Sequence, residues 1–233
     1  FAGKEYLTAL SYYQKAMSKS SKLSSDPELK YKVAECYRYT GKGDDAIKWY
    51  DDAKAAGYTN PNYLYHEGGI LLNEGKYTEA KEKLNAFLAL QPNDKDAIRM
   101  LNSCNFAVST QQEPSVYTVK NEASLNTVYS EYGSTPVKDN IIFTSSRLDD
   151  KGDNVYSYDG QGYSDLFQSG YSTTDKQWSK AQKVAALNSP FNDGVFSYCE
   201  KTKTGYFTKC NDNKSKTGTC TIVESTFDDN SNT

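Results

Sequence analysis

The chain has 233 residues, of which 37% are hydrophobic, so it is long enough for two domains with apolar cores. Its formal net charge of −3 gives no electrostatic reason to bind nucleic acid or an anionic membrane. No run of about 18 apolar residues is present, so the sequence contains no candidate transmembrane segment. No secretory signal is visible, and the chain opens at Phe1 within a helical pattern rather than at a Met. We therefore expect it to be a fragment of a longer protein.

The composition changes once along the chain. Residues 1–108 are rich in Ala, Leu, Lys and Glu at helical spacing, and residues 116–233 are rich in Ser, Thr, Tyr, Val and Gly, with short apolar runs between turn signals. The last helix of the first part is expected at 94–107, with Ile98, Leu101 and Ala107 on one face, and would cap the stack or couple it to the next domain. Residues 109–115 are predicted to be a linker. The fold class predicted is α + β in separate domains.

The helical part is internally repeated. Gly41 and Gly75 lie 34 residues apart, as do Ala46 and Ala80, and this period with paired helices resembles the tetratricopeptide family. The resemblance implies an α-solenoid in which small residues let the two helices of a pair approach closely. The other matching positions are Ala34, Tyr37, Tyr50, Ala53, Gly68, Leu71, Tyr77, Leu84, Leu88 and Pro92, with an earlier second helix at Tyr6, Ala9, Tyr13 and Ala16.

The same resemblance implies a partner-binding surface on the concave face of the array. In the register of the family, that face is lined by Tyr31, Glu35, Arg38, Tyr65, Gly69, Leu72 and Asn73, with Arg99 following. Tyr and Arg bury a large area and still form hydrogen bonds, which suits an interface. The variant of the family that captures a peptide C-terminus needs Lys and Asn where this chain has Tyr31 and Glu35, so such capture is not expected.

The second part repeats more loosely. Leu125-Asn126-Thr127 is echoed by Leu187-Asn188-Ser189, and each is followed by an acidic and Gly-containing stretch and then by predicted strands. Four strands in meander order are typical of a propeller blade. The phrases LNTVYSEYGSTPVKDNIIFTSSR and WSKAQKVAALNSPFNDGVFSYCEKTKTGYFTK resemble the WD-like repeats of TolB-type β-propellers. We expect an incomplete propeller of about two blades, because about four are needed for a closed ring.

Together, the two parts resemble the OmpA-family periplasmic proteins of Bacteroidetes that carry tetratricopeptide repeats before a propeller, and among these the PorE-like components of type IX secretion. The resemblance implies a location in the periplasm at the outer membrane, as a lipoprotein in the full-length form. It also implies protein partners from an outer-membrane or secretion complex. Peptidoglycan would be bound only through a C-terminal domain that this chain lacks.

The five cysteines are too few for a disulfide-dense fold. Cys36 and Cys104 lie in helical, apolar surroundings and are expected to be buried thiols. Cys210 and Cys220 fall at neighbouring ends of two predicted antiparallel strands, so a disulfide between them is predicted. Cys199 would then be the unpaired cysteine of the second part. The alternative is three free cysteines in a sheet.

Residue patterns for catalysis or cofactors are lacking. His66, the single histidine, has no companion for a catalytic triad or a zinc site and is interpreted as a helix-surface residue. The weak metal candidate is the loop with Asp149, Asp150 and Asp153, which lacks the spacing of an EF-hand and is interpreted as a solvated loop. We expect no enzyme activity and no cofactor, and we predict a scaffold that holds protein partners. The alternative is a sensor that binds a ligand or calcium through the propeller.

Overall fold

The computed structural model describes residues 5–111, 116–148, 152, 155–211 and 219–227. The chain divides into two compact units, Phe1–Thr118 with Ser157–Gly160, and Val119–Tyr156 with Gln161–Thr233. The described helices all lie in the first unit and the described strands in the second, so the fold is α + β. None of the described helices combines the length and the apolar character needed to cross a membrane.

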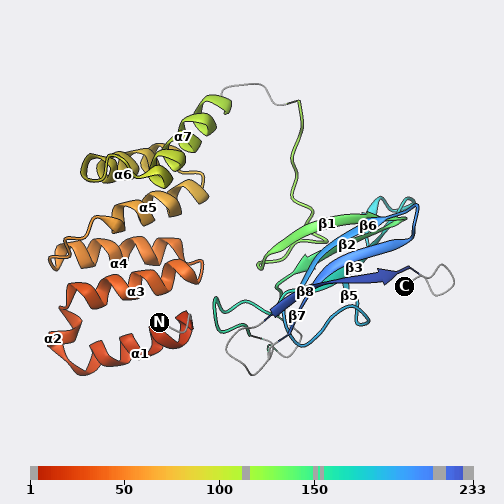
Figure 1. The fold of residues 1–233 in the computed structure, drawn as a ribbon, viewed down its shortest axis with the longest axis horizontal. Coiled ribbons are helices and arrows are strands. Elements are labelled where there is room, and N and C mark those ends of the chain that lie inside the picture. The colour runs from red at the N-terminus through yellow and green to blue at the C-terminus, as the bar shows by residue number, and fades with distance from the viewer. Residues whose placement is uncertain (1–4, 112–115, 149–151, 153–154, 212–218, 228–233) are drawn as a thin grey trace. The chain divides into compact units, whose positions relative to one another are not determined.

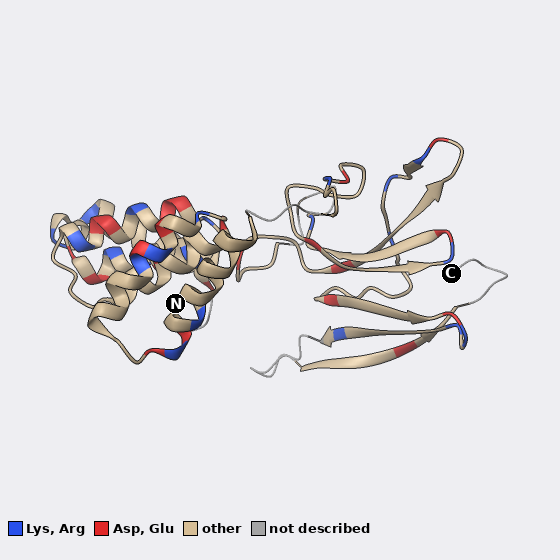
Figure 2. Cartoon of the chain, turned by 90° about the horizontal axis from the view of Figure 1, so that it is seen from above, with Lys and Arg blue, Asp and Glu red and all other residues tan. Residues whose placement is uncertain are grey.

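The first unit is a stack of helices (Figure 1). Helix α3 packs on α4 and α5 on α6, which gives two helix pairs. Charged residues of both signs are spread along these helices, whereas the strands of the second unit carry few (Figure 2). The helices are α1 (Tyr6–Lys19), α2 (Ser21–Ser24), α3 (Pro27–Tyr39), α4 (Gly43–Ala55), α5 (Asn62–Asn73), α6 (Tyr77–Leu90) and α7 (Lys95–Thr110).

The two helix pairs turn in the same way. Gly41 follows α3 with φ of 72°, and Gly75 follows α5 with φ of 74°. This left-handed conformation favours glycine because it has no Cβ. The next residues, Lys42 and Lys76, each donate a backbone hydrogen bond of 2.9 Å to the carbonyl oxygen five residues earlier. The repeat predicted from the spacing is therefore present as two equivalent helix ends.

The helices of each pair meet at small residues. Ala46 and Ala80 are fully buried, as are the large side chains Tyr50 and Leu84 four residues later. A Cβ placed on Gly68 would lie 2.7 Å from Cγ of Leu84, so only glycine permits this approach of α5 to α6. The spacing of small and large residues thus sets how closely the helices pack.

Helix α7 closes the stack. Its N-cap residue Asp94 accepts a hydrogen bond of 2.8 Å from the N–H group of Ala97, which is fully buried. An N-cap carboxylate satisfies a backbone donor that the helix itself leaves unpaired. Of the three residues predicted on one face of this helix, Leu101 packs against the core, whereas Ile98 is 39% exposed.

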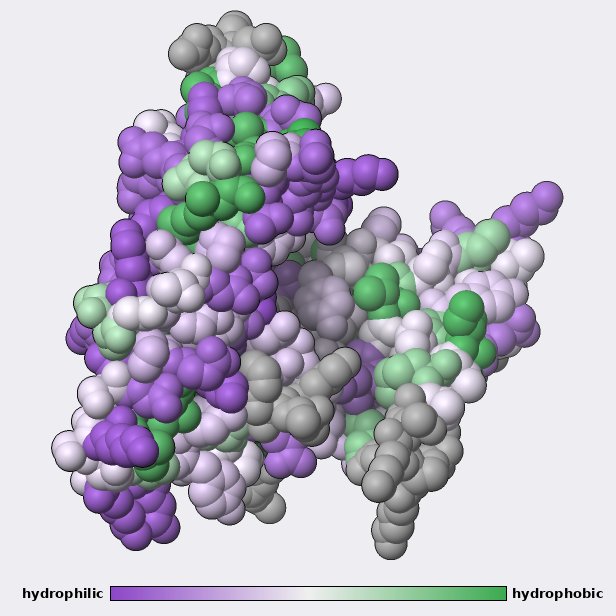
Figure 3. Space-filling model, turned by 60° about the vertical axis from the view of Figure 1, so that its left-hand side comes forward, coloured by the Kyte–Doolittle hydropathy of each residue, from purple (hydrophilic) through white to green (hydrophobic). Residues whose placement is uncertain are grey.

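The end of the first unit differs slightly from the predicted boundary. Helix α7 runs to Thr110, so the first two residues of the predicted linker 109–115 are helical, and residues 112–115 lie outside the described part. Apolar side chains are exposed near this end of the stack, among them Leu90 and Phe106. Apolar surface also interrupts the hydrophilic face of this unit in the upper part of Figure 3.

The second unit contains two antiparallel sheets (Figure 1). The first sheet has the order β1-β2-β3-β4, with β5 also paired to β3, and the second has the order β6-β7-β8. The strands are β1 (Glu131–Val137), β2 (Asn140–Ser145), β3 (Asp165–Ser172), β4 (Gln177–Trp178), β5 (Gln182–Lys183), β6 (Asp193–Cys199), β7 (Thr204–Asn211) and β8 (Thr219–Thr226).

The two sheets start in the same manner. Glu131, the first residue of β1, accepts a hydrogen bond of 2.9 Å from the N–H group of Thr127. Asp193, the first residue of β6, accepts one from the N–H group of Ser189. Each strand then has a bulge that begins at the following residue. The repeated sequence phrases therefore correspond to a repeated local structure.

The sheets share one apolar core but form no ring. Within the described residues, the first sheet has its fourth strand split into β4 and β5, and the second has three strands. The described strands close neither a barrel nor a propeller. The core residues are Val137, Ile142, Leu166, Phe196 and Phe207.

Candidate partner-binding site

The first unit has a groove of about 500 Å³, here called the helical groove. It is built from the C-terminal end of α3, the following turn with the first residue of α4, α5 with its C-cap residue, and one residue of α7. Five of the eight residues predicted for the binding face line it. The complete lining is Arg38, Gly41, Gly43, Tyr65, His66, Gly69, Ile70, Leu72, Asn73, Glu74 and Met100.

Glu35 lies beneath the groove rather than on its surface. Its side chain is only 6% exposed, so the expectation that it contacts a partner is wrong. It accepts hydrogen bonds from Nε of Arg38 at 3.0 Å and from Nη2 of Arg38 at 2.7 Å, and a third from the hydroxyl of Tyr50. Burial alone would raise the pKa of the Glu35 carboxyl, but the hydrogen bonds from Arg38 and Tyr50 and the neighbouring charges together outweigh burial, and the pKa is lowered.

These contacts fix the position of Arg38 in the groove wall. The guanidinium carbon lies 4.0 Å from the ring centroid of Tyr39, and two nitrogens are held by Glu35. A bidentate carboxylate and an aromatic face together orient the planar group. A guanidinium has more N–H groups than the two that Glu35 accepts, so Arg38 can still donate to a ligand in the groove.

His66 is part of the site and not a surface residue, which corrects the interpretation from the sequence. Its side chain is 20% exposed, and its Nε2 atom lies 3.8 Å from Oε1 of Glu35. Its ring is stacked against that of Tyr50 with the centroids 6.2 Å apart. Burial lowers the pKa of His66, so the imidazole is neutral at pH 7.

A second, smaller hollow of about 230 Å³ adjoins the helical groove and shares Tyr65 and His66 with it. Its other lining residues are Asn62, Phe87, Asp94 and Asp96. Arg99 lines neither hollow and donates a hydrogen bond of 2.8 Å to Asp96 at the surface. Arg99 lines a separate hollow of about 450 Å³ on α7, and its neighbour Met100 lines the helical groove, so the predicted role of Arg99 in binding stays a prediction.

Tyr31 is also outside the groove. Its ring stacks on that of Tyr58 with the centroids 4.4 Å apart, and it lies against Tyr50 at 5.6 Å. Tyr31 therefore does not line the helical groove, and its place on the binding face stays a prediction. Its role in the structure is packing between α3 and the segment that follows α4.

The predicted site residues of the second unit are arranged as follows. Cys210 and Cys220 lie opposite each other on β7 and β8 and form a disulfide with an S–S distance of 2.05 Å. Cys199 is a free, exposed thiol, and Cys36 and Cys104 in the first unit are free and buried. The candidate cation ligands Asp149, Asp150 and Asp153 lie outside the described residues. Elsewhere in the described chain, no group of three His, Cys, Asp or Glu is placed to hold a metal ion.

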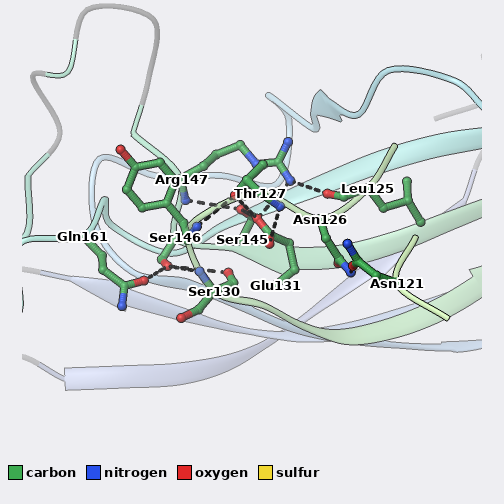
Figure 4. Close-up of polar contacts among 11 residues, drawn as sticks. Asn121, Leu125, Asn126, Thr127, Ser130, Glu131, Ser145, Ser146, Arg147 and Gln161 are labelled. Carbon is green, nitrogen blue, oxygen red and sulfur yellow. Dashed lines mark hydrogen bonds and ion pairs between the residues drawn. The ribbon is translucent and has the colours of Figure 1, made fainter. Parts of the chain in front are cut away.

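A polar network in the second unit serves to anchor a loop (Figure 4). Arg147 donates from Nη2 to the carbonyl oxygen of Leu125 at 2.9 Å and to Oε1 of Glu131 at 3.1 Å. Its guanidinium carbon also lies 4.6 Å from the ring centroid of Phe167. Because these groups satisfy one another, the network holds the segment before β1 onto β2 and β3.

Comparison with known proteins identifies part of the chain. Residues 27–94 match the family model described as "YpiA-like, C-terminal tetratricopeptide repeats". The match spans α3 to α6, which contain most of the helical groove. No curated protein matches the chain. The helical array thus contains tetratricopeptide repeats, which indicates a protein–protein interaction module, and the comparisons give no support for the resemblance to OmpA-family or PorE-like proteins.

Proposed function

We propose that the chain is a non-catalytic scaffold whose helical groove binds a protein partner. The observation that carries this proposal is the groove of about 500 Å³ within the matched repeats. Repeat arrays of this kind present rigid, pre-formed surfaces, which lowers the entropic cost of holding a partner. The groove collects Arg38, Tyr65 and Met100, residue types that are enriched at interfaces.

The absence of enzyme activity is part of the proposal. The ionisable groups near the groove are engaged with each other, since Arg38 binds Glu35 and Glu74 binds Lys76. A general base or nucleophile needs a positioned partner and access to substrate. Neither Arg38 nor the buried Glu35 meets that requirement, and the groove lining contains no Ser, Thr, Cys or Lys that His66 could activate as a nucleophile.

The proposal also places the protein in the periplasm, in an outer-membrane or secretion assembly, with a link to peptidoglycan through parts outside this chain. The resemblance of the sequence to OmpA-family proteins supports this, as does the Cys210–Cys220 disulfide, which suits an oxidising compartment. The two sheets would be two propeller blades, an assignment supported by their repeated strand starts and bulges.

Site-specific crosslinking tests the binding surface. A photo-crosslinking amino acid would replace Asn73, which is exposed and lines the groove, or Asn85, which is exposed on α6 and does not line it. In cells of the source organism, we expect one discrete crosslinked protein from position 73 that position 85 does not give. Identical products from both positions, or none from position 73, would overturn the proposal.

A further inference from the structure

The charges of the helical groove are compensated within the protein. The lining residues that carry charge or titrate near neutral pH are Arg38, His66 and Glu74. Arg38 lies 2.7 Å from Oε2 of Glu35, and Glu74 lies 2.8 Å from Nζ of Lys76. The Arg38–Glu35 pair acts as a dipole, whose field falls off faster with distance than that of a single charge. Lys76 also lies 3.6 Å from Oδ1 of Asp44, a highly exposed carboxylate that does not line the groove and is screened by water.

The remaining polar groups of the groove are neutral. Burial lowers the pKa of His66, and burial raises that of the Tyr65 hydroxyl, so each favours its uncharged form at pH 7. Asn73 adds an amide that is exposed at the end of α5. Together with the N–H groups of Arg38, these side chains offer hydrogen bonds without a net charge.

Between these polar groups the groove has an apolar floor. Gly69 has no side chain, and a Cβ placed there would lie 3.1 Å from Cε of Met100. Ile70 and Leu72 on the same helix also line the groove. The end of the Met100 side chain thus lies against Gly69, and because methionine is flexible it can move aside to admit an apolar side chain from outside.

We propose that the groove binds an extended peptide segment without charged side chains, which seats one large apolar side chain over Gly69 and Met100 and pairs its main chain with the neutral groups around them. A peptide carboxylate is disfavoured, because it would lose its hydration and face a guanidinium that Glu35 already neutralises. Main-chain carbonyl and N–H groups lose less hydration free energy than a carboxylate when they leave water. They also match hydrogen-bond donors and acceptors that carry no net charge. This inference rests on the proposed function, since it names the chemistry of the partner for the same groove.

Selection of linear peptides on the intact chain tests the inference. Random dodecapeptides displayed on phage would be selected on the immobilised protein, and the enriched sequences would be synthesised and their Kd values measured by fluorescence anisotropy. We expect enrichment of an aromatic or large aliphatic residue with no excess of Asp, Glu, Lys or Arg. The Kd should change less than about twofold between about 50 and about 500 mM NaCl, because no net charge is neutralised on binding.

Matched variants tie the binding to the groove. Asn73→Ala should weaken binding, and Gly69→Leu, which fills the apolar position, should weaken it about tenfold or more, equivalent to about 1.4 kcal/mol. Asn85→Ala, on the exposed face of α6, should leave the Kd unchanged. Circular dichroism of each variant shows that a loss of binding is not a loss of folding.

The outcomes separate the two proposals. Acidic peptides whose binding is lost with Asn73→Ala and falls about tenfold in high salt would overturn the uncharged-segment inference and leave the groove as the binding site. Peptides that bind equally well to all variants, or no enriched peptide at all, would overturn both the inference and the proposed function.

Discussion

Glu35 and Glu28 lie on the same helix, α3, and differ in what surrounds them. Glu35 is buried and accepts hydrogen bonds from Arg38 and Tyr50. Glu28 is exposed and lies 3.9 Å from Nζ of Lys32. A buried charge that loses its partner is costly, whereas an exposed ion pair contributes little because water screens it.

We therefore predict different effects for two matched substitutions. Glu35→Gln should lower the free energy of unfolding by about 3 kcal/mol, because the guanidinium of Arg38 would remain partly buried without its counter-charge. Glu28→Gln should lower it by less than about 1 kcal/mol. Urea denaturation followed by far-ultraviolet circular dichroism measures both. Equal losses would show that the pair beneath the groove is not desolvated.

The single histidine, His66, makes the free energy of unfolding depend on pH near neutrality. Burial lowers the pKa of His66 in the folded chain, whereas an unfolded histidine titrates near about 6.5. The unfolded state then binds more protons below that pH, so the free energy of unfolding falls as the pH drops from about 7 to about 5.5. In His66→Asn this decrease should be smaller.

Nuclear magnetic resonance of the imidazole checks the cause, since the chain has only one histidine. The expected result is a pKa below about 6.5 in the folded protein. A pKa at or above that value would mean that the negative charge of Glu35, at 3.8 Å, outweighs burial.

Part of the site was predictable at the level of residues. The repeat register predicted Arg38, Tyr65 and Asn73, which line the helical groove, and Arg99, whose neighbour Met100 lines the groove instead. The same period of 34 that links Gly41 to Gly75 carries His66 onto Met100, so the signal for these two residues was present in the sequence. It was missed because one residue turns a helix by about 100°, and a small error in the register moves a side chain to the edge of a face.

Gly68 and Gly69 on α5 show that the effect of an added methyl group on stability depends on which neighbouring atoms it meets. A Cβ on Gly68 would meet Cγ of Leu84 at 2.7 Å and the carbonyl oxygen of Ala80 at 3.5 Å. A Cβ on Gly69 would meet only the mobile end of Met100 at 3.1 Å. Gly68→Ala should therefore force α5 and α6 apart, whereas Gly69→Ala should not.

The predicted difference between the two variants is large. Gly68→Ala should lower the free energy of unfolding by about 1–3 kcal/mol, as for overpacked cores. Gly69→Ala should leave it unchanged or raise it by up to about 1 kcal/mol, because alanine favours the helix. Urea denaturation of both variants measures this difference. A stable Gly68→Ala variant would show that Leu84 can move away at little cost.

Whole elements were predicted more securely where the signal is local. The helix ends at Gly41 and Gly75 follow from glycine's conformational freedom, and the matching strand starts at Glu131 and Asp193 follow from a repeated phrase. The split of the fourth strand of the first sheet into β4 and β5 was not foreseen. Strand pairing depends on residues far apart in the chain, and that information is not contained in a local pattern.

At the scale of the molecule, the two units have separate cores. The clusters around Leu84 and Tyr50 contain only residues of the helical unit, and the cluster around Phe196 only those of the sheets. A domain with its own core can unfold on its own. We expect calorimetry of the intact chain to show two transitions, each sensitive to changes in one unit.

Unit-specific variants assign the transitions. The disulfide Cys210–Cys220 joins residues 10 apart, and the double variant Cys210→Ser with Cys220→Ser should lower the stability of the sheet unit by about 2–3 kcal/mol, because its unfolded state gains freedom. Gly68→Ala should shift only the other transition. Cys199→Ser, which removes the exposed thiol, serves as the control and should shift neither. A single transition displaced by both the disulfide variant and Gly68→Ala would mean that helices and sheets unfold as one cooperative unit, and a partner bound in the groove would then stabilise the sheets as well.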